Sequence, residues 1–155
     1  MNLYLVRHAE AKPQEVDAQR PLSDKGRADI EKVGAFLSAH TTAKVDRILH
    51  SGKTRAQQTA EVLARHLRAE QKVSATDDLG PNADPSIWVK RLDRETSDLM
   101  VVGHLPYMDR LCATLVTGDD ATSVVAFQMG AVVCLTRDDS GRWVVSWMVT
   151  PAMLK

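Results

Sequence analysis

The sequence has very little cysteine. Cys112 and Cys134 are the only two in 155 residues, and neither has the CxxC or CxxH neighbours of a zinc site. Two cysteines cannot build a disulfide framework, so we expect both to be small buried hydrophobic residues. This use of cysteine indicates a reducing compartment, and we expect the protein to be cytoplasmic.

Long apolar runs and an excess of one charge are also missing. No segment approaches the ~20 apolar residues that span a bilayer, so we expect no membrane association. The N-terminus lacks a basic segment followed by a long apolar region, so we expect no signal peptide. Lys plus Arg and Asp plus Glu both number 20, and no overall field draws the chain to nucleic acid. A strong anion site must therefore be a local concentration of cations.

What the chain does contain is an ordinary globular composition, with 44% apolar and 26% charged residues. It has no repeat, no low-complexity segment and no linker. The length fits one domain and makes two improbable. We therefore predict a single domain over residues 1–155, and a monomer.

Short apolar runs alternate with helical patterns along the chain. Strands are expected at residues 3–6, 45–51 and 98–104, and residues 72–79 are expected to hold a short strand. Helices are expected at residues 21–40, with Ser23 as N-cap, and at 53–67, 84–95 and 105–118. Residues 123–150 favour further strands, with a turn at 137–142. This order predicts an α/β fold: a three-layer α/β/α sandwich with a mostly parallel central sheet and antiparallel edge strands.

Charged and polar side chains follow three of the predicted strands. Arg7 and His8 come after the first, Ser51 and Arg55 after the second, and His104 after the fourth. Ligands of open α/β sheets bind outside the carboxyl ends of the strands. Guanidinium groups match the oxygens of phosphate or carboxylate, and a neutral imidazole can act as a nucleophile. If these strand ends lie side by side, they form one anion site.

Three motifs in this order resemble the histidine phosphatase superfamily. Residues 7–10 (RHAE) are similar to its RHG signature, residues 51–59 (SGKTRAQQT) to its second arginine motif, and residues 103–104 (GH) to its second histidine. The compact length and the segments 20–27 (RPLSDKGR) and 103–111 (GHLPYMDRL) resemble the SixA-type phosphohistidine phosphatases within that family. The resemblance covers nearly the whole chain and implies a phosphoglycerate mutase-like fold.

The resemblance also implies roles for individual residues. His8 would attack phosphorus and become transiently phosphorylated, while Arg7 and Arg55 hold the equatorial oxygens and His104 stabilises the developing charge. No metal or cofactor is expected, because the arginines neutralise the charge that magnesium handles elsewhere. The phosphate-binding set is expected to be Arg7, Arg55, His104, Arg20 and Ser51.

The sequence departs from the family pattern in two places. Ala9 stands where the family has glycine, which requires a negative φ there. Larger members carry a proton-donating carboxylic acid after the third strand, but residues 79–82 (LGPN) offer none, and Asp78 and Asp84 only lie nearby. An alkoxide leaving group, with a conjugate pKa of roughly 15, needs such a donor. An imidazole, with a pKa near ~6.5, does not, so the missing acid favours P–N over P–O cleavage.

These observations predict a metal-independent phosphohistidine phosphatase that acts through phospho-His8. Short connections between the second helix and the fourth strand predict an open, shallow mouth. Such a mouth suits a histidine on another protein, such as the histidine-phosphotransfer domain of a bacterial phosphorelay. Two alternatives stay open: a small-molecule phosphomonoesterase of the same superfamily, and a non-catalytic phosphoanion-binding module.

Overall fold

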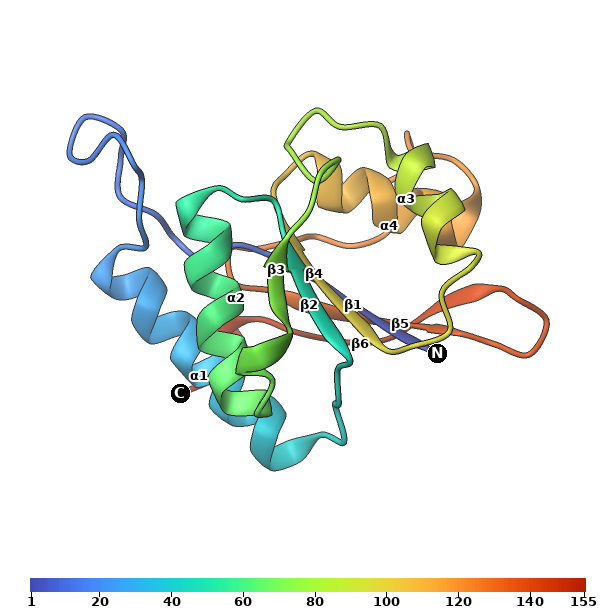
Figure 1. Cartoon of the computed structure of the whole chain (residues 1–155), viewed down its shortest axis with the longest axis horizontal. Coiled ribbons are helices and arrows are strands. Elements are labelled where there is room, and N and C mark those ends of the chain that lie inside the picture. The colour runs from blue at the N-terminus through green and yellow to red at the C-terminus, as the bar shows by residue number, and fades with distance from the viewer.

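A six-stranded sheet forms the centre of the structure, a computed structural model that describes residues 1–155 (Figure 1). The strand order is β3-β2-β4-β1-β5-β6. The parallel strands are β1 (Asn2–Arg7), β2 (Arg47–His50), β3 (Val73–Ala75) and β4 (Leu99–Gly103). An antiparallel hairpin at one edge consists of β5 (Val132–Arg137) and β6 (Trp143–Val149). The predicted mostly parallel sheet with antiparallel edge strands is confirmed.

Two pairs of helices cover the two faces of this sheet (Figure 1). One face carries α1 (Asp24–His40) and α2 (Thr54–Leu67), and the other carries α3 (Pro85–Leu92) and α4 (Tyr107–Thr117). Two short 3-10 turns, η1 (Glu70–Lys72) and η2 (Pro151–Met153), complete the elements. The predicted three-layer sandwich is therefore present. No helix combines the length and the hydropathy that crossing a bilayer requires.

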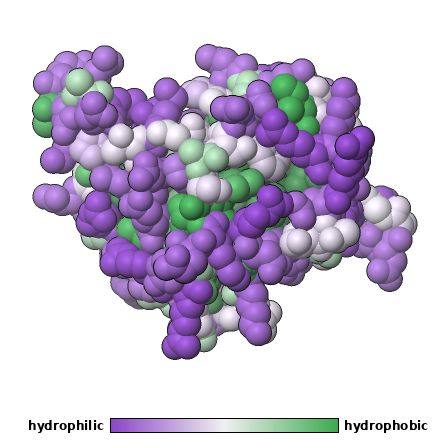
Figure 2. Space-filling model, in the orientation of Figure 1, coloured by the Kyte–Doolittle hydropathy of each residue, from purple (hydrophilic) through white to green (hydrophobic).

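Each central strand serves two hydrophobic cores at once. In β1, Tyr4 and Val6 pack against the α1–α2 layer, while Leu3 and Leu5 pack against the α3–α4 layer. Successive side chains of a strand point to opposite faces, so a strand covered on both faces needs an unbroken apolar run. That requirement explains why residues 3–6 show no polar alternation. On the face of the molecule that Figure 2 presents, apolar residues lie in the middle and hydrophilic residues surround them.

The helix ends follow the capping chemistry of the sequence. The Ser23 hydroxyl accepts a hydrogen bond from the Gly26 N–H at 3.0 Å, as predicted for the N-cap of α1. α4 ends before Gly118, whose φ of 81° is the left-handed conformation that glycine adopts without strain. These caps fix the orientation of the loops that precede and follow the strands.

One predicted strand region is wrong. Residues 123–130 form a loop, and β5 begins only at Val132. Phe127 is buried in the α3–α4 core, but its backbone carbonyl accepts a hydrogen bond from the Arg7 side chain. Gly130 then turns the chain with a φ of 77°. Phe127 of this segment thus packs in the core with its side chain and contacts the site with its backbone carbonyl. The segment forms no strand.

Candidate active site

The carboxyl ends of β1, β4 and β2 lie side by side. Arg7 of β1 is paired in register with Gly103 of β4, and His50 of β2 is paired with Val102 of β4. The residues that follow each strand therefore emerge at the same edge of the sheet. The structure brings together there the side chains that the sequence singled out, which are Arg7, His8, Ser51, Arg55 and His104.

His8 is held with one ring nitrogen unprotonated. Its Nδ1 lies 2.7 Å from the Ala9 carbonyl oxygen, and because a carbonyl can only accept, Nδ1 carries the proton. Nε2 therefore carries the lone pair, and the Arg55 Nε–H points at it over 3.3 Å. Burial lowers the pKa of His8 to about 4, helped by the positive charges of Arg55 and Arg7 and opposed by the hydrogen bond to Ala9. At neutral pH the imidazole is uncharged, which is the nucleophilic form.

His104 faces His8 from the end of β4. The two ring centroids are 5.0 Å apart, with the planes tilted by 54°. Nε2 of His104 lies 2.6 Å from the Ser51 hydroxyl oxygen, and its Nδ1 is buried without a partner. Burial lowers the pKa of His104 to about 3, with further lowering by His8 and the neighbouring cations. Ser51 therefore orients a second neutral imidazole toward the same space.

The arginines of the site have no carboxylate partners. Arg7 donates from Nη1 to the Phe127 carbonyl at 2.9 Å, and its Nε is buried without an acceptor. Neither Arg7 nor Arg55 takes part in any of the seven ion pairs of the protein. Partly buried guanidinium groups without counter-ions favour an anionic ligand.

Arg20 lies on the loop of residues 11–21, which projects from the body as a narrow arm (Figure 1). The base of this arm is closed by a bridge between Ala11 and Leu22. Arg20 adopts a φ of 47° and donates from Nε to the Lys12 carbonyl at 3.2 Å. Its positive charge contributes to lowering the pKa of both His8 and His104. A hollow of about 430 Å³ separates the arm from the start of α2, and Arg20 and Arg55 both line it.

Thr59 and Gln58 attach the arm and the nucleophile to α2, although the sequence analysis assigned them no role of their own. The fully buried Thr59 hydroxyl accepts from the Ala9 N–H at 3.1 Å and donates to the Arg55 carbonyl at 2.7 Å. The Gln58 side chain accepts from the Leu22 N–H at 2.8 Å. One helix thus holds both ends of the arm. In the sequence, the only indication of a role for Thr59 and Gln58 is that both lie within the second arginine motif.

The two acidic residues near the expected proton-donor position have structural partners. Asp78 forms an ion pair with Arg91 at 2.6 Å. Asp84 caps α3 by accepting from the Ser86 N–H at 2.9 Å, and hydrogen bonds from Ser86 lower its pKa. The Asp84 carboxylate is therefore ionised at neutral pH and has no proton to donate.

Two further sequence positions are explained by the geometry. Ala9 does not have a positive φ, so alanine can replace the glycine of the family at this position without backbone strain. Glu10 accepts a hydrogen bond from the Ser23 hydroxyl at 2.7 Å, which ties the segment after His8 to the start of α1. No group of three or more His, Cys, Asp or Glu side chains is placed to bind a metal ion.

Comparisons with known proteins agree with this geometry. Residues 3–80 match the model of the histidine phosphatase superfamily (branch 1), and the chain belongs to this family. Over 160 residues it is 27% identical to phosphohistidine phosphatase SixA of Escherichia coli (strain K12), a match that covers 100% of this chain and 97% of the relative. The predicted resemblance to SixA-type members is confirmed, and the hydrolase class follows.

Solved structures show the same relationship. The protein histidine phosphatase SixA complexed with tungstate superimposes with a TM-score of 0.87 at 26% identity, covering 100% of both chains. The putative phosphohistidine phosphatase SixA from Agrobacterium tumefaciens gives a TM-score of 0.78 at 25% identity, covering 97% of both. A phosphoglycerate mutase from Bacillus anthracis str. Sterne, at 12% identity and a TM-score of 0.71, shares the fold, with 94% of this chain and 91% of that one covered.

Proposed function

We propose that the protein hydrolyses phosphohistidine on a partner protein through a phospho-His8 intermediate. The observation that carries the proposal is the state of His8, an uncharged imidazole whose unprotonated Nε2 accepts a hydrogen bond from Arg55, an arginine without a counter-ion. The SixA names of the relatives support the same substrate class. Tungstate, an analogue of the phosphate ion, is bound in one of these relatives, and phosphate is the anion proposed for this pocket.

In the first step, the phosphoryl oxygens of the substrate bind to Arg7 and Arg55. Arg55 then exchanges its contact with His8 for an oxygen of the phosphoryl group, which frees the lone pair of Nε2. Nε2 attacks phosphorus in line with the departing nitrogen, so a P–N bond to His8 forms while the P–N bond to the substrate breaks. The leaving imidazole takes its proton from solvent.

In the second step, water attacks the phosphorus of phospho-His8. The new P–O bond forms while the P–N bond to His8 breaks, so phosphate leaves and the neutral imidazole returns. One proton of the attacking water passes to solvent or to the departing phosphate. Arg7, Arg55 and the Ser51-oriented His104 surround the oxygens in both steps and supply the stabilisation that magnesium gives in other phosphoryl-transfer sites.

The leaving group is proposed to be nitrogen rather than oxygen. Asp78 and Asp84 are engaged with Arg91 and Ser86, so neither is available as a general acid. An alkoxide departs slowly without a proton donor, whereas an imidazole is protonated readily by solvent near neutral pH. Small sugar phosphates are accordingly expected to be poor substrates.

We further propose that the partner is a histidine-phosphotransfer domain of a bacterial phosphorelay in the cytoplasm, and that the enzyme acts as a monomer. The hollow between the arm and α2 is open to the surface and is lined by Arg55, which contacts His8. Through such an opening, a histidine presented on the surface of another protein can reach Nε2 of His8. No cofactor is required by this mechanism.

The experiment compares rates on phosphorylated histidine-phosphotransfer domains, phosphoramidate and sugar phosphates, each with and without excess chelator. We expect fast hydrolysis of the P–N bond in the phosphorylated domains and in phosphoramidate, slow hydrolysis of the sugar phosphate esters, and no effect of chelator on either rate. His8→Ala should abolish turnover while keeping phosphate binding, and His40→Ala, at an exposed helix position, is the matched control. Faster cleavage of sugar phosphates would favour the phosphomonoesterase alternative, and no turnover on any substrate would favour the binding module.

A further inference from the structure

We propose that the hollow between the arm and the start of α2 binds a carboxylate of the partner protein, located about one helical turn from the phosphohistidine. Lys53 and Arg20 are the residues that would hold it. This inference rests on the proposed function and adds a requirement on the partner: an acidic side chain beside the phosphorylated histidine.

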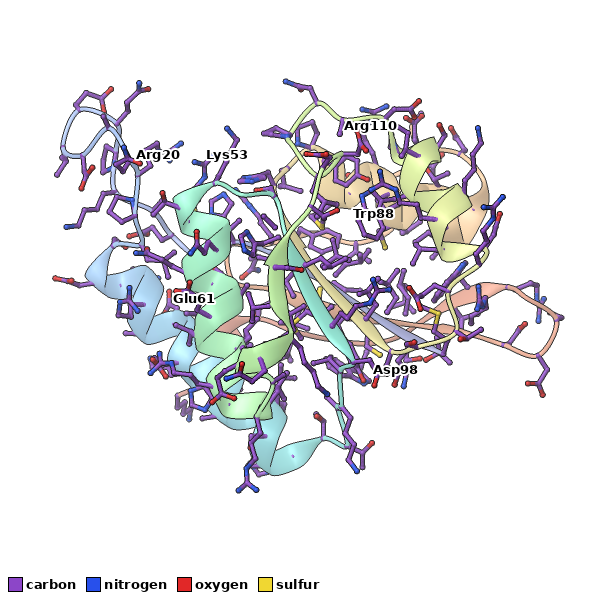
Figure 3. All side chains as sticks on the ribbon, viewed as in Figure 1. Arg20, Lys53, Glu61, Trp88, Asp98 and Arg110 are labelled. Carbon is purple, nitrogen blue, oxygen red and sulfur yellow. The ribbon has the colours of Figure 1, made fainter.

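The lining of the hollow is cationic and contains no acidic residue. Arg20 lies on the arm, while Lys53 and Arg55 lie at the start of α2. Figure 3 shows Arg20 and Lys53 at the same end of the molecule, where the arm and α2 face each other. The remaining lining residues are uncharged, namely Gln14, Ala18, Gln19, Gly52 and Thr54. The protein has no net charge, so this is a local concentration of cations.

The site and the hollow together hold more positive charges than one phosphoryl group can balance. A protein-bound phosphoryl group carries about two negative charges near neutral pH, which Arg7 and Arg55 match. Arg20, which the sequence placed among the expected phosphate ligands, and Lys53 are then in excess. Neither takes part in any of the seven ion pairs of the protein. Both contribute to lowering the pKa of His104, so their charges are felt inside the site. Two unpaired cations at the mouth favour a further anion there.

The start of α2 adds to this preference. Lys53 is the N-cap and makes no side-chain capping bond, and the first turn contains no acidic residue. The backbone N–H groups at a helix N-terminus carry a partial positive charge. Residues 52–55 line the hollow, so the N-terminus of α2 lies beside Lys53 and Arg20. Its partial positive charge also favours an anionic ligand.

The spacing on the partner follows from helix geometry. Residues four apart on a helix have Cβ atoms about 5–6 Å apart and share one face. Lys53 precedes Arg55 by two positions and lines the same hollow, so the proposal puts the carboxylate about one helical turn from a phosphohistidine held by Arg55. A glutamate at that place would meet the hollow, whereas a glutamine would bring no charge.

The experiment uses two helical peptides that differ in one residue, each phosphorylated on a single histidine with phosphoramidate. One peptide carries Glu four residues before and after the histidine, and the other carries Gln at both positions. At low salt, the Glu peptide should have a kcat/KM about two- to fivefold higher, the range of an exposed ion pair. Lys53→Gln should remove this preference and Lys53→Glu should reverse it, with no such change in the ratio for Lys44→Gln. Lys44 is equally exposed but precedes β2, at the opposite end of the sheet.

An equal rate for both peptides in the wild type, or a preference that survives in Lys53→Gln, would overturn the proposal. Failure of the wild type to hydrolyse either peptide or phosphoramidate would instead overturn the proposed function. In that case, fluorescence anisotropy of the same peptides on His8→Ala still decides the docking proposal, because it reports binding without turnover. Loss of the Glu preference at high salt is expected, since exposed charges are screened.

Discussion

The Nε–H of Arg55 lies 3.3 Å from Nε2 of His8, so the arginine proposed to hold phosphate already contacts the nitrogen proposed to attack it. The contact keeps the imidazole turned toward the anion site. The guanidinium charge also disfavours protonation of His8. One residue thus prepares the nucleophile before substrate binds and is available to the phosphoryl oxygens afterwards.

Replacement of Arg55 should therefore reduce activity strongly. We expect Arg55→Ala to lower kcat/KM on phosphoramidate by about 10²–10³-fold, the cost of removing a preorganised donor. Arg55→Lys should recover only part of the loss, because an ammonium group lacks the bidentate fork of guanidinium. Arg65→Ala, on the same helix but paired with Glu31, is the control and should stay near the wild-type rate. Activity of Arg55→Ala within threefold of wild type would remove Arg55 from the mechanism.

The titration of His8 gives a second prediction. Burial, followed by the charges of Arg55 and Arg7, lowers the pKa of His8 to about 4. The imidazole should therefore stay neutral at pH 5, where a solvent-exposed histidine is mostly protonated. Ring chemical shifts followed by NMR between pH 3 and 8 would measure this. A midpoint for His8 near the unperturbed value would contradict the buried, cation-flanked site.

The same shift makes stability depend on pH. The unfolded chain binds more protons than the folded one once the pH falls below the ordinary histidine pKa of ~6.5. Stability is therefore full above that value and is lost as the pH falls toward 4, by about 3 kcal/mol for His8. Urea unfolding at pH 7.5 and 4.5 should show a smaller loss for His8→Asn than for wild type. His40→Asn should lose as much stability as wild type, and an equal loss in all three proteins would refute this origin.

Thr59 offers a fourth prediction, because its hydroxyl joins the backbone after His8 to the carbonyl of Arg55. Thr59→Val keeps the shape but leaves the Ala9 N–H without a partner, which should destabilise the fold by about 1–3 kcal/mol. It should also lower kcat more than it raises KM, since the nucleophile and the arginine lose their common support. Thr59→Ser keeps the hydroxyl and should restore both properties.

Thr114 provides the matched control for Thr59. Its hydroxyl donates to the Arg110 carbonyl at 2.7 Å, the same bond within a helix, but it supports no loop of the site. Thr114→Val should therefore leave kcat unchanged. If Thr59→Val lost stability without any change in kcat, Thr59 would be a structural residue only.

The carboxylates near the site give the fifth prediction. Asp84→Asn keeps a capping side chain and removes the acid, so it should change neither stability nor kcat. Asp84→Ala also removes the cap of α3 and should cost about 1 kcal/mol in urea unfolding, again with kcat unchanged. Asp78→Asn, which loses its ion pair with Arg91, should likewise keep its activity. A hundredfold loss of kcat in either asparagine variant would identify a general acid.

Much of this protein was determined by its sequence alone. The unbroken apolar run of β1 requires cover on both faces, and Ser23 and Gly118 mark helix ends through local capping chemistry. The three motifs fall directly after strands, and parallel strands bring such positions to one edge. Each of these signals is local, because it depends on residues close to one another in the chain.

Other features were decided only by the tertiary structure. Arg7 binds the carbonyl of Phe127, 120 positions away, and Thr59 binds the N–H of Ala9, 50 positions away. Such bonds depend on strand order and on how the layers pack, and they cannot be predicted from neighbouring residues in the sequence. Residues 123–130 were wrongly predicted to be a strand for the same reason. The sequence shows that the segment around Phe127 is apolar, but it does not show which residues pack against it. The uncharged state of His8 also arises from burial beside arginines, which exists only once the chain has folded.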